Sequence, residues 1–237
     1  MSKYCIRTDY KINTKKRPEN DAVGLQYTTP EKKALSGRYQ RSVYEAALKI
    51  ARDNHCEAIL EVGCGPATNL NAFFSEGFKI YGVDHDSAIS QCQRMHRNGT
   101  YLSDDIESSI YGLKHYIDFA DLIICSSVFE HLKDPASALE FIKTFAHPGT
   151  FIVISTPERN ALCGKNAVTP SNEFHIREWS FDEFHRFIIK AGFKIEEQKM
   201  MLPFSFGFDP MTAAYCAKRI LRGLPLATTQ MVVCKVK

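Results

Sequence analysis

The sequence predicts an α/β protein in which a mostly parallel sheet is covered by helices on both faces. From residue 58 to residue 155, short apolar runs alternate with stretches whose apolar residues recur every three or four positions. The run at 120–125 is continuous and apolar enough to be buried on both faces, as central parallel strands are. Glycine and proline lie at the ends of the apolar runs. Such a succession indicates β-α-β units and therefore parallel strand pairing.

The expected elements follow this alternation along the whole chain. The predicted strands are 58–62, 78–84, 100–103, 120–125, 150–155, 193–200 and 228–237. The predicted helices are 37–54, 68–76, 87–97, 135–146, 180–191 and a further one near 211–222. The helix at 180–191 has the clearest start, because Ser180 and Glu183 form the capping-box pair.

Composition is that of an ordinary globular protein and excludes several classes. The 237 residues are 44% hydrophobic and 24% charged, so the chain should bury roughly 70–75% of its unfolded surface without disulfides or metal. The net charge of +3 is too mild to indicate nucleic acid by itself. No apolar run approaches the ~20 residues of a membrane span, and none of the eight cysteines forms a CxxC pair. We therefore expect a cytoplasmic protein with reduced thiols.

The domain organisation is expected to be an irregular amino-terminal arm over 1–36 and one domain over 37–237. The arm is a candidate lid. Its basic residues Lys11, Lys15, Lys16 and Arg17 are interpreted as solvated, with an anionic partner as the alternative. Two segments, 157–179 and 203–226, are candidate cap insertions beside the sheet edge where ligands bind. The second alternates apolar and basic residues. A cap packed on the core is favoured for it, and a substrate wall, a dimer contact or a membrane-surface helix are the alternatives.

The sharpest motif joins the first strand to the following helix. Glu61 and Val62 end the strand, and the Gly63-Cys64-Gly65 turn follows directly. Glycine allows the backbone to turn sharply and to approach a ligand, and a helix start presents free N–H groups. Asp84 lies 21 residues after Gly63 at the next strand end, where a carboxylate can accept both hydrogen bonds of a ribose diol. This spacing suits nicotinamide cofactors as well as other adenosine-containing cofactors.

These motifs resemble those of class I S-adenosylmethionine-dependent methyltransferases. Glu61 to Gly65 with Asp84 looks like motif I and the acidic strand end that follows it, and Asp104-Asp105-Ile106 fits the third-strand acid of that family. Residues 126–135 are similar to the VLEHLxDP strand exit of its ubiquinone-biosynthesis-like branch. The resemblance covers about residues 37–200, with Ala67 in place of a third glycine. It implies a Rossmann-like, seven-stranded sheet with a reversed last strand, and S-adenosyl-L-methionine as cofactor.

The resemblance also implies roles for individual residues. Glu61, Gly63 and Gly65 are expected near the methionine part of the cofactor, and Asp84 at its ribose. The remaining candidates for the cofactor site are Cys64 in the same turn, Asp105 or Asp104 with Ile106 at the adenine, His85 flanking the adenine, Ser126 at the fourth-strand exit and Arg38 at the methionine carboxylate. For His85, an exposed loop histidine is the alternative. For Arg38, a surface arginine on an amphipathic helix is the alternative.

Two histidines lie on the expected acceptor side. Transfer of a methyl group to a hydroxyl oxygen gains from a base near neutral pKa, and histidine suits that task. His131 follows the fourth strand. His175 ends the covering loop with Phe174, Arg177 and Trp179, in a segment that is expected to lie beside the cleft. Both are candidate catalytic bases, with a structural hydrogen bond as the alternative for His131. Arg177 is expected to pair with Glu178 rather than with a substrate.

The predicted activity is methyl transfer to an oxygen, or less favourably a nitrogen, of a small metabolite or sugar. One alternative is a metal-assisted RNA 2′-O-methyltransferase, because Glu130, His131 and His175 look like part of the metal site of the small-RNA enzymes. In those enzymes a further glutamate occupies the position of Ser127, so no metal is assigned, and nucleic acid is not the expected partner. A catalytically silent cofactor-binding protein is the contrasting class. The acceptor and the oligomeric state stay open.

Overall fold

A computed structural model describes residues 2–14, 40–107, 112–202 and 210–237 of the chain. Its seven-stranded sheet has the order β3-β2-β1-β4-β5-β7-β6. The strands are β1 (Ala58–Val62), β2 (Lys79–Asp84), β3 (Thr100–Ser103), β4 (Leu122–Ser126), β5 (Phe151–Pro157), β6 (Ile195–Met201) and β7 (Thr229–Lys235). Neighbouring strands are parallel from β3 to β5, while β7 is antiparallel to both β5 and β6. The predicted α/β class, the seven strands and the reversed last strand are confirmed.

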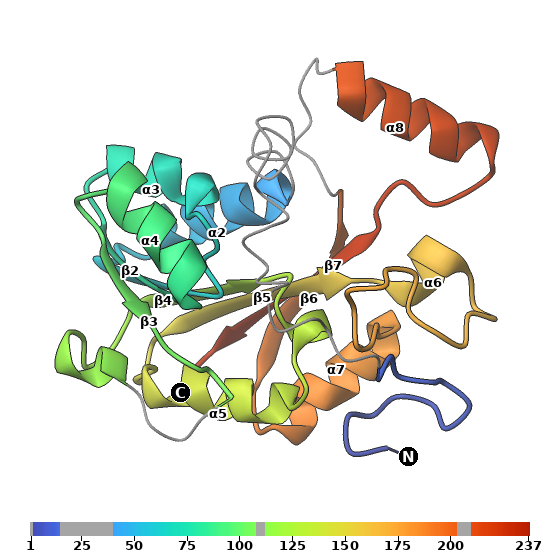
Figure 1. The fold of residues 1–237 in the computed structure, drawn as a ribbon, viewed down its shortest axis with the longest axis horizontal. Coiled ribbons are helices and arrows are strands. Elements are labelled where there is room, and N and C mark those ends of the chain that lie inside the picture. The colour runs from blue at the N-terminus through green and yellow to red at the C-terminus, as the bar shows by residue number, and fades with distance from the viewer. Residues whose placement is uncertain (1, 15–39, 108–111, 203–209) are drawn as a thin grey trace.

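Helices cover both faces of this sheet (Figure 1). One face carries α2 (Arg41–Asp53), α3 (Asn71–Ser75) and α4 (Asp86–Met95), and the other carries α5 (Pro135–Thr144) and α7 (Phe181–Lys190). Each predicted helix is present within a few residues of its expected bounds, except that 68–76 is split into the 3₁₀ turn η2 (Thr68–Leu70) and α3. The remaining helix, α8 (Pro210–Leu221), lies apart from these layers at the rim of the molecule.

Short helical turns occupy segments that the sequence pattern left as loops. They are η3 (Gly112–His115), η4 (Phe129–His131) and α6 (Arg159–Cys163). Turns of three to five residues are too short to show a helical period, so hydrophobic periodicity has no power to find them. Two of them matter for the site, because η4 follows β4 and α6 lies in the covering loop.

The amino-terminal segment 2–14 has neither helix nor strand, yet part of it belongs to the core. Ile6 and Tyr10 are buried in the same cluster as Trp179, and the indole N–H of Trp179 donates to the carbonyl of Tyr4 at 3.1 Å. Lys11 is exposed, as expected. The other residues of the candidate lid, 15–36, lie outside the described part of the chain.

A buried ion pair fixes α6 and the start of α7. Arg159 Nη1 lies 2.7 Å from Glu183 Oε2, and both side chains are buried. The same glutamate completes the predicted capping box, since its carboxylate accepts from the backbone N–H of Ser180 at 3.0 Å. The Ser180 hydroxyl accepts from the N–H of Glu183 at 3.4 Å in return.

The capping box gives a stability prediction. We expect Ser180→Ala to lower the free energy of unfolding by about 1 kcal/mol, because it removes the cap acceptor for the first turn of α7. Urea unfolding followed by circular dichroism measures the change. Ser90→Ala, at an exposed position inside α4, is the matched control and should be neutral or slightly stabilising. Equal effects at both positions would show that the cap contributes nothing.

Candidate functional site

The predicted site residues lie along the carboxyl ends of the parallel strands. β1 is paired with β2 on one side and with β4 on the other, so the chain leaves β1 at the point where the strand order reverses. In open α/β sheets the ligand crevice lies outside the carboxyl ends of the strands at this point. The loops that follow β1, β2, β3, β4 and β5 therefore converge there.

The turn after β1 requires both of its glycines. Gly63 has φ +74° and Gly65 has φ +51°, in the left-handed region that favours glycine. A Cβ on Gly63 would lie 2.3 Å from Val128 Cγ2, so η4 and the turn approach each other too closely for any side chain. A Cβ on Gly65 would meet nothing within 4 Å. The turn is therefore packed on one side and borders open space at Gly65.

Asp84 contacts this turn directly. Its Oδ2 accepts from the backbone N–H of Gly65 at 2.7 Å, and its Oδ1 accepts from the N–H of His85 at 2.7 Å. The glycine turn and the acid, predicted from positions far apart in the sequence, thus form one unit. A ribose diol beside Asp84 would meet an oriented carboxylate next to the open space at Gly65.

Glu61 is a buried acid with an unusual protonation state. Its Oε1 accepts from the hydroxyl of Tyr44, while its Oε2 is buried without a hydrogen-bond partner. Burial raises the pKa of Glu61 to about 8, although the Tyr44 hydrogen bond opposes that shift. A buried carboxyl with one unused oxygen fits a ligand that donates to it. Together with the open space at Gly65 and the Asp84 carboxylate, this unpartnered oxygen fits a cofactor that joins an amino acid to a nucleoside.

The Glu61 pKa predicts an inverse pH dependence of stability. The pKa is about 8 in the folded state and about 4.3 in an unfolded chain, so the folded protein binds more protons between these values. The free energy of unfolding should therefore fall by about 1.4 kcal/mol per pH unit across that window. Glu61→Gln should remove this contribution, whereas Glu173→Gln, at an exposed position, should not. Urea unfolding at pH 5, 6.5 and 8 tests this, and a wild-type slope unchanged in Glu61→Gln would contradict it.

The acids after β3 serve the local turn in this structure. Asp104 accepts from the N–H groups of Asp105 and Gly112, at 2.9 and 2.8 Å, and Asp105 accepts from the N–H of Glu107 at 2.9 Å. Asp105 is exposed and Asp104 is half-buried. Asp105 therefore keeps more room for an adenine amine, while the side chain of Ile106 is buried in the core.

The other predicted cofactor residues lie at or near the same edge. His85 is exposed at the start of α4. Cys64 is buried, with its Sγ 4.0 Å from that of Cys92. Ser126 shares a 2.7 Å hydrogen bond with Ser155 and donates to Gln40. Arg38 lies outside the described residues.

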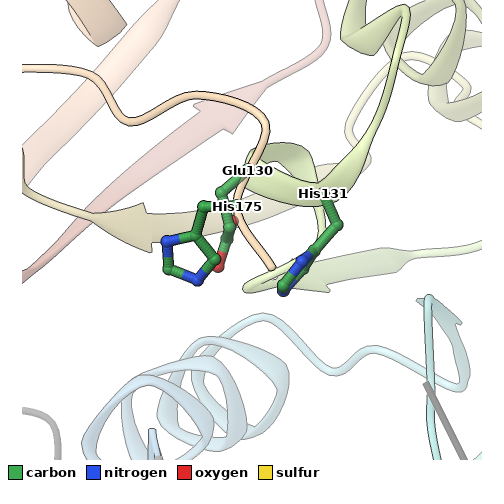
Figure 2. A group of neighbouring side chains, drawn as sticks. All are labelled: Glu130, His131 and His175. Atoms are coloured by element: carbon green, nitrogen blue, oxygen red, sulfur yellow. The ribbon is translucent and has the colours of Figure 1, made fainter. Parts of the chain in front are cut away.

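Glu130, His131 and His175 lie close together where η4 meets the covering loop (Figure 2). One ligand-type atom from each, a carboxylate oxygen or an imidazole nitrogen, lies within 4.8 Å of the other two. The covering loop is joined to η4 by the N–H of Ile176, which donates to the carbonyl of Glu130 at 2.7 Å. That bond places His175 beside His131. The two imidazole rings lie edge to face, with their centroids 4.9 Å apart.

Hydrogen bonds to oxygen acceptors orient both imidazoles. His175 Nδ1 lies 2.6 Å from Glu178 Oε1, and His131 Nδ1 lies 3.0 Å from the carbonyl of Phe174. Because a carbonyl or carboxylate can only accept, these contacts assign the proton to Nδ1 in each ring and the lone pair to Nε2. His175 Nε2 accepts from Asn172 Nδ2 at 3.1 Å.

Glu178 holds His175 as a buried charge partner. It is fully buried and accepts from the hydroxyl of Ser171 at 2.8 Å. Burial alone would raise the pKa of Glu178, but hydrogen bonds and charge from His175 and Ser171 outweigh it and lower the pKa. The carboxylate therefore stays ionised, where it would stabilise an imidazolium on His175.

Two expectations for the covering loop are wrong. Arg177 does not pair with Glu178. Its guanidinium donates to the carbonyls of Leu132 and Lys133, at 2.7 and 2.9 Å, and lies over the ring of Tyr4. Trp179 does not border a cleft, because it is fully buried against Phe184 and Phe187. Both residues position the loop rather than contact an acceptor.

The fold and this site together define a class I S-adenosylmethionine-dependent methyltransferase. Residues 32–198 match the family described as a methyltransferase domain, and the chain belongs to that family. Among the described residues, no helix combines the length and hydropathy that crossing a bilayer requires.

Curated relatives carry the name ubiquinone biosynthesis O-methyltransferase. The protein of Thiobacillus denitrificans is 30% identical over 106 residues, which are 44% of this chain and 45% of that protein. The protein of Serratia proteamaculans is 28% identical over 117 residues, 47% of each chain. The matched region thus spans about half the length of these relatives.

Solved structures share the fold at low identity. A methyltransferase in complex with the Haloferax volcanii Trm112 methyltransferase activator has a TM-score of 0.70 at 14% identity, over 92% of this chain and 99% of that one. A TehB-like methyltransferase of Corynebacterium glutamicum has a TM-score of 0.62 at 16% identity, over 92% of this chain and 100% of that one. The [4+2]-cyclase SpnF has a TM-score of 0.63 at 14% identity, over 92% of this chain and 97% of that one.

Proposed function

We propose that the protein transfers the methyl group of S-adenosylmethionine to a hydroxyl oxygen of a small metabolite or sugar. The observation that carries the proposal is the placement of two sites along one sheet edge. The Gly63–Gly65 turn with Asp84 is the proposed cofactor site, and the oriented His131 and His175, from the exit of β4 and the covering loop, are the proposed acceptor side. Oxygen is favoured over nitrogen because the curated relatives are named O-methyltransferases.

In this proposal the cofactor, when bound, supplies an electrophilic methyl group on a sulfonium. Asp84 binds the ribose, and the ionisable Glu61 accepts from the methionine part, so the main task of these residues is orientation. Orientation alone can contribute ~7–11 kcal/mol to such a displacement. The chain must also take up the hydroxyl proton. Nε2 of His175 is the proposed acceptor of that proton, after the substrate displaces Asn172, and the ionised Glu178 stabilises the resulting imidazolium.

Transfer of labelled methyl from S-adenosylmethionine to an acceptor panel tests the proposal. The panel holds phenols, catechols, sugars and amines of similar size. We expect label in hydroxyl acceptors and loss of that label in the Asp84→Asn variant. If only the amines are labelled, the acceptor atom is nitrogen rather than oxygen. Tight cofactor binding with no transfer to any acceptor would favour the silent class, and the presence of a cyclase among the fold neighbours shows why fold cannot exclude it.

A second proposal is that a divalent cation joins Glu130, His131 and His175, with an RNA ribose as acceptor. It is supported by the three convergent ligand atoms and by the bond from His175 Nδ1 to Glu178, which orients that imidazole. Carboxylate and two imidazoles suit several divalent metals. Ser127 in place of a second carboxylate counts against it.

Chelation separates the two proposals. Activity that survives excess EDTA would remove the metal, whereas loss in EDTA and recovery with Mn²⁺ or Mg²⁺ would establish it. For an RNA acceptor, the affinity should fall steeply between 50 and 200 mM salt, because the slope of log affinity against log salt scales with the number of phosphates contacted. A small uncharged acceptor should show no such dependence.

A further inference from the structure

Helix α8 turns an apolar face away from the protein. Ile220 is 64% exposed and Leu221 is 87% exposed. Ala213, Ala214 and Ala217 are also exposed and recur with them at helical spacing, so the five share one face. Leu224, just beyond the helix, is 38% exposed. Among the side chains of α8 that the structure describes, only Arg219 is buried.

Polar contacts hold the helix in this orientation. Arg219 Nη2 donates to the carbonyl of Ala161 in α6 at 2.6 Å, and its Nε donates to the carbonyl of Pro225. The hydroxyl of Tyr215 shares a 3.0 Å hydrogen bond with that of Thr228 at the start of β7. The inward face is thus the polar one and the outward face the apolar one, the reverse of a surface helix on a globular core. Figure 1 shows α8 standing at the rim, apart from the helix layers.

The charges around the apolar face are all positive. Residues 210–237 contain no aspartate or glutamate and carry five cations. Lys218 is exposed and its helical position places it beside the apolar face, and Arg222 is exposed in the turn directly after α8. An exposed apolar face bordered by lysine and arginine is the pattern of a helix that lies in a membrane interface.

We infer that α8 docks on an anionic lipid surface. Ile220, Leu221 and Leu224 enter the boundary between headgroups and acyl chains, while Lys218 and Arg222 meet the acidic headgroups. A second copy of the chain is a poorer occupant of this face. Two α8 helices packed face to face would meet with cations but no acid in residues 210–237 of either copy to pair with them.

Vesicle co-sedimentation of the full chain tests the inference. The vesicles are phosphatidylcholine alone or an equimolar mixture with phosphatidylglycerol. We expect binding to the anionic vesicles, weak binding to phosphatidylcholine, and loss of binding in 0.5 M NaCl. Removing the cations in Lys218→Gln/Arg222→Gln should weaken binding about fivefold for each one. Ile220→Ser/Leu221→Ser should weaken it at least about tenfold, because each side chain loses its transfer into the acyl boundary.

The matched control is Ile189→Ser on α7, where an isoleucine is also half exposed. It should leave vesicle binding unchanged, and all variants should keep the wild-type thermal unfolding and cofactor binding. No binding to anionic vesicles, equal binding to both lipids, or no effect of the Ile220/Leu221 change would overturn the inference. So would a concentration-dependent dimer in sedimentation velocity that the same change abolishes, which would assign the face to a second copy.

Discussion

Gly63→Ala is expected to weaken S-adenosylmethionine binding at least about 100-fold and to destabilise the fold by roughly 2–5 kcal/mol. Two separate costs add at this position. The left-handed backbone at φ +74° costs a residue with a Cβ about 1–2 kcal/mol. The new Cβ would also lie 2.3 Å from Val128 Cγ2, so the turn or η4 must move. Movement of the turn would displace the Gly65 N–H from Asp84 and disrupt the cofactor site.

Gly77→Ala is the control that measures the cost of the left-handed backbone alone, without a steric clash and away from the cofactor site. Gly77 has φ +82°, and a Cβ there would meet nothing within 4 Å. It should cost only the backbone term, about 1–2 kcal/mol, and leave cofactor affinity unchanged. Calorimetric titration and urea unfolding of both variants provide the measurement. A Gly63→Ala protein that binds the cofactor like wild type would show that the turn after β1 is not the binding element.

His175→Asn is expected to lower kcat by about 10²–10⁴ while cofactor affinity stays at the wild-type value. Asparagine keeps an N–H near the position of Nδ1, so the buried Glu178 is not left without a donor. The variant lacks the Nε2 lone pair that takes up the hydroxyl proton of the methyl acceptor. The loss should therefore fall on kcat, with thermal unfolding at the wild-type value, which a purely structural role of His175 would not give.

Two comparison variants make this result interpretable. His185→Asn changes a histidine on α7 whose Nδ1 bonds Gln198, and it should leave kcat unchanged. His131→Asn keeps a donor toward the Phe174 carbonyl and should have the smaller effect of the two site histidines. If His131→Asn instead lowers kcat more than His175→Asn does, the base is His131 and His175 positions it.

The sheet could be predicted from the sequence because its signals are local and strong. The continuous run at 120–125 and the glycine turn after residue 62 each specify a strand and its exit without knowledge of the rest. β-α-β alternation then fixes the parallel order, which brings Gly65 and Asp84 together. The capping box of α7 was equally readable, since both partners lie within four residues.

What the sequence did not show depends on contacts between distant segments. Tyr44, the partner of Glu61, lies on α2 with no motif around it. Glu178 appeared only as a possible partner of Arg177, because the spacing of three residues to His175 carries meaning only once the loop geometry is known. Trp179 looked like a cleft residue by composition, but the arm residues 4–10 and α7 bury it. The outward apolar face of α8 is likewise a matter of orientation, which periodicity alone does not determine.

Isothermal titration of the purified chain with S-adenosylmethionine and with its demethylated product S-adenosylhomocysteine is the most direct measurement. We predict saturable heat for both ligands at one site per chain, and affinity about 10–100-fold weaker in Asp84→Asn, which loses a charged acceptor for the ribose. A well-folded wild-type protein that gives no heat with either ligand would contradict the assignment of the Gly63–Gly65 turn and Asp84 as a cofactor site.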